Sequence, residues 1–211
     1  ARFFRLALTR HDDRQKAKVD ISDMELSPRY CIEQLAGKAS FMMHGLPAAP
    51  AEWPMAPPGI AIPRGRIMDL TSDMDATGRL TWGVPSGKWT ILRIGHTTTG
   101  KDNHPAPESG RGLECDKFSK EAAAAMFNGL MGRLIADNEG LAGRGKTLVS
   151  THIDSWEVGS QNWTPRMREE FRNRRGYDLW KFLPTFTGRV VDSVEVTERF
   201  LWDLRQTVSD L

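Results

Sequence analysis

The chain has 211 residues, of which 39% are hydrophobic and 27% are charged, and its 29 basic and 27 acidic side chains leave a formal net charge of +2. This nearly neutral balance is typical of a globular protein, and the length allows one or two domains. The sequence contains neither the run of about 18 apolar residues that a membrane-spanning helix needs nor a basic cluster of the density typical of nucleic-acid-binding proteins.

The first hundred residues have the pattern of short β-strands separated by turns. Apolar or β-branched runs alternate with turn-forming residues, such as those at 75–78 and 85–87. Six prolines between positions 46 and 63 each remove a backbone donor, so this stretch is predicted to be a connector or an ordered surface loop. The predicted strands are residues 2–9, 19–26, 66–70, 79–82 and 88–96.

Beyond residue 100 the pattern changes to helices and a strand. Ser119 is predicted to cap a helix that extends to about Asp137, because its hydroxyl can accept a hydrogen bond from a free N–H of the first turn. Residues 147–154 are short, apolar and β-branched, as expected of a buried parallel strand.

Two more helices are predicted after this strand. The first has Thr164 as its N-cap and Gly176 as its C-cap. The second covers residues 179–183, with Asp178 as its cap and Pro184 as its end. A strand placed between helices in this way predicts an α/β fold, either a layered sheet or a barrel.

Both ends of the chain indicate a piece of a longer protein. The N-terminus has neither an initiator Met nor a signal peptide. The apolar residues from Val194 onward keep helical spacing up to Leu211, without a Gly or Pro that would end a helix. We therefore expect a fragment.

The segment 152–163 carries the strongest chemical signal. It begins where the predicted strand ends, which is where α/β proteins place their active sites. Its tryptophans can cover the C–H face of a sugar while its carboxylates, amides and histidine bind hydroxyls. Glu157 lies beside Trp156, and desolvation there would raise the pKa of this carboxyl group, as a general acid requires. The structural alternative is that Asp154 caps a turn, the tryptophans pack in the core and Glu157 is solvated.

A second polar segment, residues 109–117, is rich in glycine and lies just before the helix that starts after Ser119. It contains Arg111, Glu114 and Asp116. It is no phosphate-binding loop, because its glycine spacing differs from that motif. The alternative is an ordinary helix entry made by Asp116, with Arg111 and Glu114 as a solvated ion pair.

The sequence gives no signature of a transition-metal site or of a serine hydrolase. Its five histidines and two cysteines do not have zinc-ligand spacing, and no G-x-S-x-G motif is present. Two cysteines are also too few for a disulfide scaffold. Calcium bound by carboxylates and carbonyls needs no such signature, so that cofactor stays open.

Four motifs, in this order, resemble glycoside hydrolase family 106, whose members are α-L-rhamnosidases. They are residues 87–100, 110–117, 154–164 and 174–178. The resemblance is specific from residue 66 and weaker before it. It implies part of a (β/α)₈ TIM-like barrel over residues 66–211, preceded by β-sandwich-like structure in residues 1–65. It also implies a bacterial, secreted or periplasmic enzyme that inverts the anomeric centre and often binds calcium.

The resemblance also implies roles for individual residues. Glu157 is the candidate general acid, and Glu114 is the one candidate for a second catalytic carboxylate within the chain, since the partner is otherwise expected beyond Leu211. The candidate sugar-binding residues are His96, Arg111, Asp116, His152, Asp154, Trp156, Gln161, Asn162 and Trp163.

The sequence therefore predicts part of a hydrolase that cleaves terminal α-L-rhamnosyl linkages of a glycan or glycoside with two carboxylates. The isolated fragment is expected to be inactive, because part of the site is missing. One alternative is a non-catalytic carbohydrate-binding module, in which the same tryptophans and amides hold a sugar without chemistry. Another is a structural fragment with no activity of its own. Neither a nucleic acid nor a membrane is an expected partner.

Overall fold

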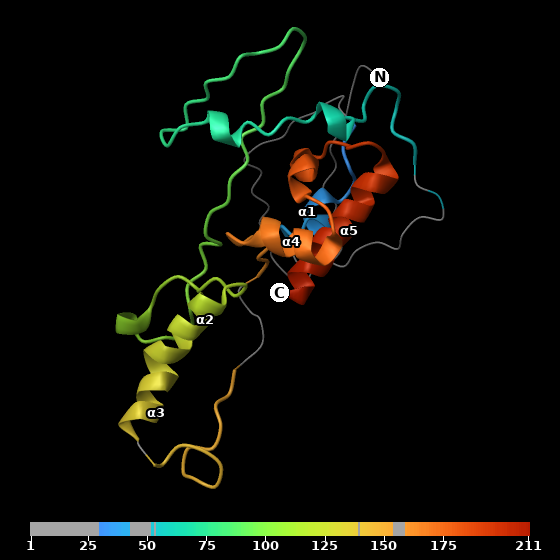
Figure 1. Cartoon of the computed structure of the whole chain (residues 1–211). Helices are drawn as coiled ribbons and strands as arrows, with labels where there is room; N and C mark the ends of the chain where they lie inside the picture. The colour runs from blue at the N-terminus through green and yellow to red at the C-terminus, as the bar shows by residue number, and fades with distance from the viewer. Residues whose placement is uncertain (1–29, 43–51, 53, 139, 154–158) are drawn as a thin grey trace, which may run out of the picture.

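The computed structural model describes residues 30–42, 52, 54–138, 140–153 and 159–211. Figure 1 shows two parts of different character. Helices α1, α4 and α5 pack into a cluster, whereas α2 and α3 lie end to end in an outlying arm. An extended path through the intervening residues joins the two.

The hydrophobic core belongs to the helical cluster. It is formed by α1 (Leu35–Lys38), α4 (Met167–Arg175), the 3-10 helix η5 (Leu179–Thr187) and α5 (Val194–Asp210). The rings of Phe182 and Phe200 stack with centroids 4.7 Å apart, which joins η5 to α5. The buried apolar residues are Ile32, Ala39, Met167, Phe171, Leu179, Phe182, Val190, Val191, Val194, Phe200, Leu201 and Leu204.

Helix α5 confirms the prediction from the C-terminal apolar spacing. Ser193 caps it, since its hydroxyl accepts a hydrogen bond from the N–H of Val196 at 3.1 Å. Two buried threonines share the apolar face. The hydroxyl of Thr197 donates to the carbonyl of Val191 at 3.0 Å, so it is buried without an unmet hydrogen bond.

Helix α4 ends as predicted at Gly176, whose φ of 79° is the left-handed conformation that favours glycine. The carboxylate of Asp178 then caps η5 by accepting from the N–H of Trp180 at 3.1 Å. The predicted end of this helix at Pro184 is wrong. Pro184 is buried inside η5, which continues to Gly188, where the backbone again becomes left-handed at φ 81°.

Two distant segments are attached to the turn between η5 and α5. The N–H of Ile32 donates to the carbonyl of Gly188 at 3.0 Å, and the N–H of Ile62 donates to the carbonyl of Val190 at 2.9 Å. These bonds hold the segment with α1 and the segment around residue 62 against the helical cluster.

The arm is one helical stretch made of three pieces. They are α2 (Lys120–Phe127), the π-helical turn η4 (Asn128–Gly132) and α3 (Arg133–Asp137). The predicted cap is confirmed, since the hydroxyl of Ser119 accepts from the N–H of Ala122 at 3.2 Å.

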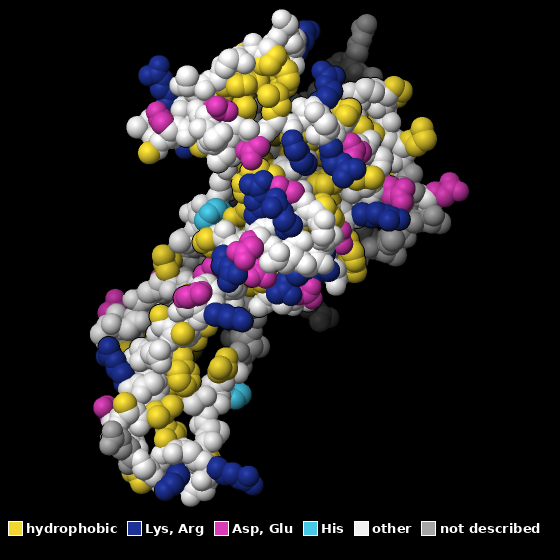
Figure 2. Space-filling view, viewed as in Figure 1, with side chains coloured by type: hydrophobic (Ala, Val, Ile, Leu, Met, Phe, Trp, Pro, Cys, Tyr) yellow, Lys and Arg dark blue, Asp and Glu magenta, His cyan; other side chains and the backbone are white. Residues whose placement is uncertain are grey.

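None of the described residues between positions 52 and 153 is buried, and Figure 2 shows hydrophobic side chains exposed along the arm.

The predicted (β/α)₈ barrel and the β-sandwich before it are wrong. The described residues contain no strand, only isolated bridges such as Met74 with Leu80 and Ala142 with Leu148. The predicted buried strand at 147–154 is exposed where it is described, with Val149 62% and Ile153 77% accessible. The predicted strands at 2–9 and 19–26 lie outside the described residues, and the domain boundary at residue 65 stays a prediction.

Between residues 66 and 82, pairing is limited to the antiparallel bridge of Met74 with Leu80, and side-chain carboxylates shape the turns beside it. The carboxylate of Asp75 accepts from the N–H groups of Thr77 and Arg79, at 2.9 and 3.0 Å. Asp69 accepts in the same way from the N–H of Thr71 at 3.0 Å. Such bonds satisfy backbone donors in turns and compete with a β-ladder. The short 3-10 helices η1 (Arg64–Arg66) and η2 (Thr71–Asp73) lie in or beside this stretch, and η3 (Glu108–Gly110) comes later in the chain.

No helix in the described part of the chain has both the length and the apolar composition needed to cross a membrane.

Candidate functional site

The structure brings together the two polar segments that the sequence singled out. The carboxylate of Asp116 accepts hydrogen bonds from the side-chain amide of Gln161 at 2.6 Å and from the hydroxyl of Thr164 at 2.7 Å. It also accepts from the N–H of Phe118 at 3.0 Å, as the helix-entry alternative requires. Asp116 therefore joins the start of the arm to the chain that leads into α4.

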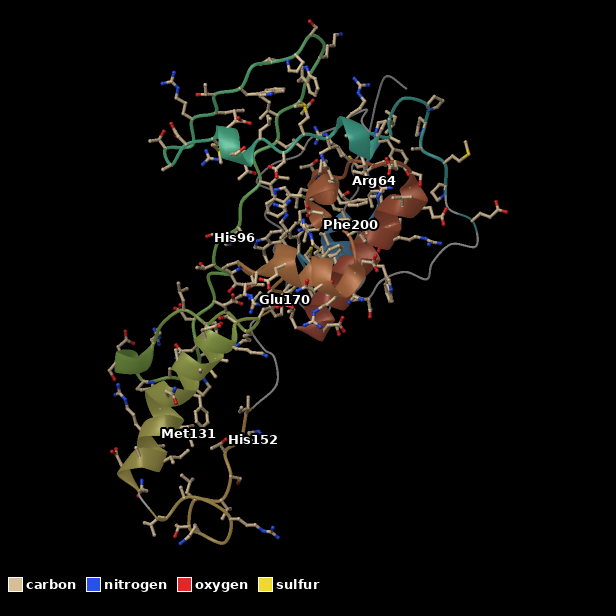
Figure 3. The ribbon with its side chains drawn as sticks, viewed as in Figure 1. Arg64, His96, Met131, His152, Glu170 and Phe200 are labelled. Atoms are coloured by element: carbon tan, nitrogen blue, oxygen red, sulfur yellow. The ribbon has the colours of Figure 1, made fainter. Side chains whose placement is uncertain are left out.

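Trp163 lies in a row of aromatic rings. Its ring centroid is 6.3 Å from that of His96 and 6.2 Å from that of Trp180. The planes of these two rings are inclined to the plane of Trp163 by 34° and 33°. Phe186 meets it edge-on at 6.3 Å. Three separate segments thus place aromatic side chains at one position, and Figure 3 shows His96 beside the helical cluster.

A charged residue completes this row on the α4 side. The guanidinium of Arg168 lies 4.5 Å from the ring centre of Trp180 and makes two hydrogen bonds, of 3.0 and 2.6 Å, to the carboxylate of Asp178. Hydrogen bonding to Arg168 is the main reason that the pKa of Asp178 falls to about 2, and the same bond raises the pKa of Arg168. Both groups are therefore charged at neutral pH.

The polar side chains before Trp163 hold the backbone near α1. The amide of Asn162 donates to the carbonyl of Ala39 at 2.8 Å, and the hydroxyl of Ser160 donates to the carbonyl of Ser40. These two bonds fix the chain immediately after residue 159 against a segment 120 positions earlier.

The second acidic candidate is already paired. The carboxylate of Glu114 accepts from the ammonium of Lys117 at 2.7 Å, and both side chains are largely shielded from solvent. Arg111 does not pair with Glu114 as the solvated-pair alternative supposed; it lies 3.5 Å from exposed Glu108. Arg111 is itself exposed, so it is the least enclosed of the candidates in this segment.

Among the described candidates, His152 lies apart from His96. It is exposed, and Figure 3 places it at the level of Met131 in the arm, away from His96. Three predicted site residues, Asp154, Trp156 and Glu157, lie outside the described residues, so their placement stays a prediction.

Several members of the observed arrangement were not among the predicted site residues, including Thr164, Arg168, Asp178, Trp180 and Phe186. Thr164 was expected only as a helix cap, whereas its hydroxyl donates to Asp116 and its backbone carbonyl accepts from Met167 at 3.0 Å. Trp180 and Arg168 lie in predicted helices, and helical position alone does not reveal that a side chain stacks against a distant loop. The sequence signal that could have pointed to Trp180 was its position two residues after Asp178, the predicted helix cap.

Among the described residues, no three His, Cys, Asp or Glu side chains come together as metal ligands. Calcium binding stays a prediction.

Three findings relate this chain to known proteins. The family model for glycoside hydrolase family 106, described as alpha-L-rhamnosidase, matches residues 5–211. The structure of a rhamnosidase from Novosphingobium sp. PP1Y is similar, with a TM-score of 0.69 and 31% sequence identity, over 88% of this chain and 18% of that chain. A protein of Formosa agariphila named "Putative beta-glucuronidase" is 46% identical over 155 residues, which are 74% of this chain and 13% of that protein. This chain thus spans less than a fifth of either relative.

Proposed function

Because this chain belongs to glycoside hydrolase family 106, the α-L-rhamnosidases, we propose that it is part of an enzyme that hydrolyses terminal α-L-rhamnosyl linkages. The match over residues 5–211 is the observation that carries the proposal, and the similarity to a Novosphingobium rhamnosidase supports it. The substrate is a carbohydrate of the rhamnoside class.

The proposed reaction is a direct displacement with inversion. A carboxylic acid protonates the departing oxygen, while a carboxylate activates a water on the opposite face of the sugar, about 6.5 to 9.5 Å from the acid. Glu157 is the proposed acid. Glu114 is the alternative within this chain for the base, and its ion pair with Lys117 keeps its carboxylate in a defined place.

The aromatic row supports a sugar as the ligand. A pyranose has an apolar C–H face that packs on aromatic rings, and Trp163 is the central ring of the row formed with His96 and Trp180. We assign Trp163 the role of sugar platform in the intact enzyme. Gln161 and Asn162 use their amides to bind Asp116 and the carbonyl of Ala39, so they fix the backbone that leads to this platform.

A second candidate function is hydrolysis of β-glucuronides, which the name of the Formosa agariphila relative favours. A glucuronide carries a carboxylate that rhamnose lacks, so its site needs a cation close to the sugar. Arg168 is a cation that contacts the aromatic row through Trp180, but it is already bound to Asp178 by two hydrogen bonds. This pairing favours the neutral sugar.

The test is hydrolysis by the full-length protein of two chromogenic substrates, an aryl α-L-rhamnoside and an aryl β-D-glucuronide. We expect release from the rhamnoside alone, with inversion seen by following the anomeric proton of the first-formed sugar. Release from the glucuronide alone would establish the second candidate. Sugar binding without turnover of either substrate would instead support the carbohydrate-binding alternative.

A further inference from the structure

Both carboxylate oxygens of Asp116 are already bound by the protein. One accepts from the amide of Gln161 and from the N–H of Phe118, and the other accepts from the hydroxyl of Thr164. Thr164 is only 3% exposed. A carboxylate with three donors from its own chain is poorly placed to receive a sugar hydroxyl as well.

The two side chains that Asp116 binds stand on either side of Trp163 in the sequence. The amide of Gln161 also donates to the carbonyl of Trp163 at 3.4 Å, so Asp116 holds one residue two positions before the platform ring and another directly after it. The ring itself neighbours the rings of His96 and Trp180 and is partly buried against the hydrophobic core.

We propose that Asp116 is a positioning residue: it clamps Gln161 and Thr164 and thereby fixes the Trp163 ring for stacking on the sugar, without contacting the sugar itself. This inference rests on the proposed function, because it assigns Trp163 to sugar binding. It replaces the expectation that Asp116 binds a hydroxyl of the substrate.

Two substitutions of Asp116 distinguish a positioning role from a direct contact with the sugar. Asp116→Asn keeps the shape, and its amide nitrogen can donate to the hydroxyl of Thr164, which accepts as readily as it donates. The clamp therefore survives in Asp116→Asn but is lost in Asp116→Ala. A carboxylate that binds a sugar hydroxyl makes a charge-assisted bond, so for it the neutral Asn would be nearly as harmful as Ala.

The experiment is a double-mutant cycle in the full-length enzyme, with kcat and KM measured on an aryl α-L-rhamnoside. We expect Asp116→Ala to lower kcat/KM by about 10- to 100-fold, mainly through a higher KM, and Asp116→Asn to stay within about threefold of wild type. In a Trp163→Ala background, Asp116→Ala should add less than about threefold, since its effect acts through that ring. Asp137→Ala, an exposed carboxylate in α3, is the matched control and should leave both constants unchanged.

Two results would overturn the clamp: equal losses in Asp116→Asn and Asp116→Ala, or fully multiplicative losses with Trp163→Ala. If Asp116→Ala does not fold, Thr164→Val removes a single hydroxyl and should give a smaller loss that also vanishes in the Trp163→Ala background. A wild-type enzyme that is inactive on every rhamnoside overturns the proposed function instead, so the two failures are distinguishable.

Discussion

The side-chain amide of Gln161 lies 2.6 Å from the carboxylate of Asp116, although 45 positions separate the two residues. This hydrogen bond connects the segment just before α2 to the segment just before α4. The two segments are the ones whose residue types suggest sugar chemistry, and this hydrogen bond brings them together in one candidate site.

Glu157→Gln in the full-length enzyme tests the acid role. Glutamine keeps the shape but cannot donate the proton, so glycosides with poor leaving groups should lose about 10²- to 10⁴-fold in kcat. An activated aryl leaving group departs with little protonation and should lose much less. Equal losses for both substrate classes would point to a base or electrostatic role, and an unchanged kcat with a raised KM would leave Glu157 only a binding role.

Phe200→Ala should destabilise the helical cluster by about 3 to 5 kcal/mol, because it removes a 1% exposed ring that stacks on Phe182 and leaves a cavity. Denaturant unfolding measured by helical circular dichroism gives the free-energy change. Trp202→Ala is the control, since Trp202 is on the same helix but 57% exposed, and it should change stability by less than about 0.5 kcal/mol. Similar losses for the two variants would contradict the assigned core.

Asp178→Asn should alter the acid end of the stability profile. Asp178 has a pKa of about 2 in the folded chain against an ordinary 3.8, so its contribution is complete above about pH 4 and is lost as the pH falls toward 2. The substitution should cost about 1 kcal/mol at pH 7 after solvent screening, because Arg168 is partly exposed. Thermal unfolding from pH 7 to 2 should show the difference from wild type shrinking below pH 4; a constant difference would contradict it.

Ser193→Ala should weaken the start of α5 by about 1 kcal/mol, since the hydroxyl that accepts from the N–H of Val196 is removed. Ser209→Ala, near the end of the same helix and exposed, is the matched control. Comparison of the two unfolding midpoints measures the cap. If the control lost as much as Ser193→Ala, the cap would have no special role.

Helix ends were predictable from the sequence because their causes are local. Ser119 as a cap and Gly176 in the left-handed conformation both act within one turn of their own helices. The apolar period of α5 is likewise contained in 17 residues. Pro184 misled the prediction, since a 3-10 helix that is buried by its neighbours can include a proline.

Strands were not predictable in the same way, because a strand depends on a partner elsewhere in the chain. The β-branched run at 147–154 had the right composition, yet Val149 is exposed and only the bridge between Ala142 and Leu148 forms near it. In the candidate site, too, local features could be predicted and long-range contacts could not. Its polar segments could be recognised from residue types, but the bond from Thr164 to Asp116 depends on a tertiary approach that no local pattern encodes.

The lack of buried side chains in the described residues between 52 and 153 has a consequence for hydrogen exchange. Amides of α2 are protected only by the bonds of their own helix, so they should exchange through local opening at low free energy. Amides near Phe171 and Leu204 should not exchange by local opening, because both side chains are fully buried in the core that α4 and α5 share. In this chain the slowest exchange should therefore mark α4 and α5, and the arm should exchange as a separate, faster unit.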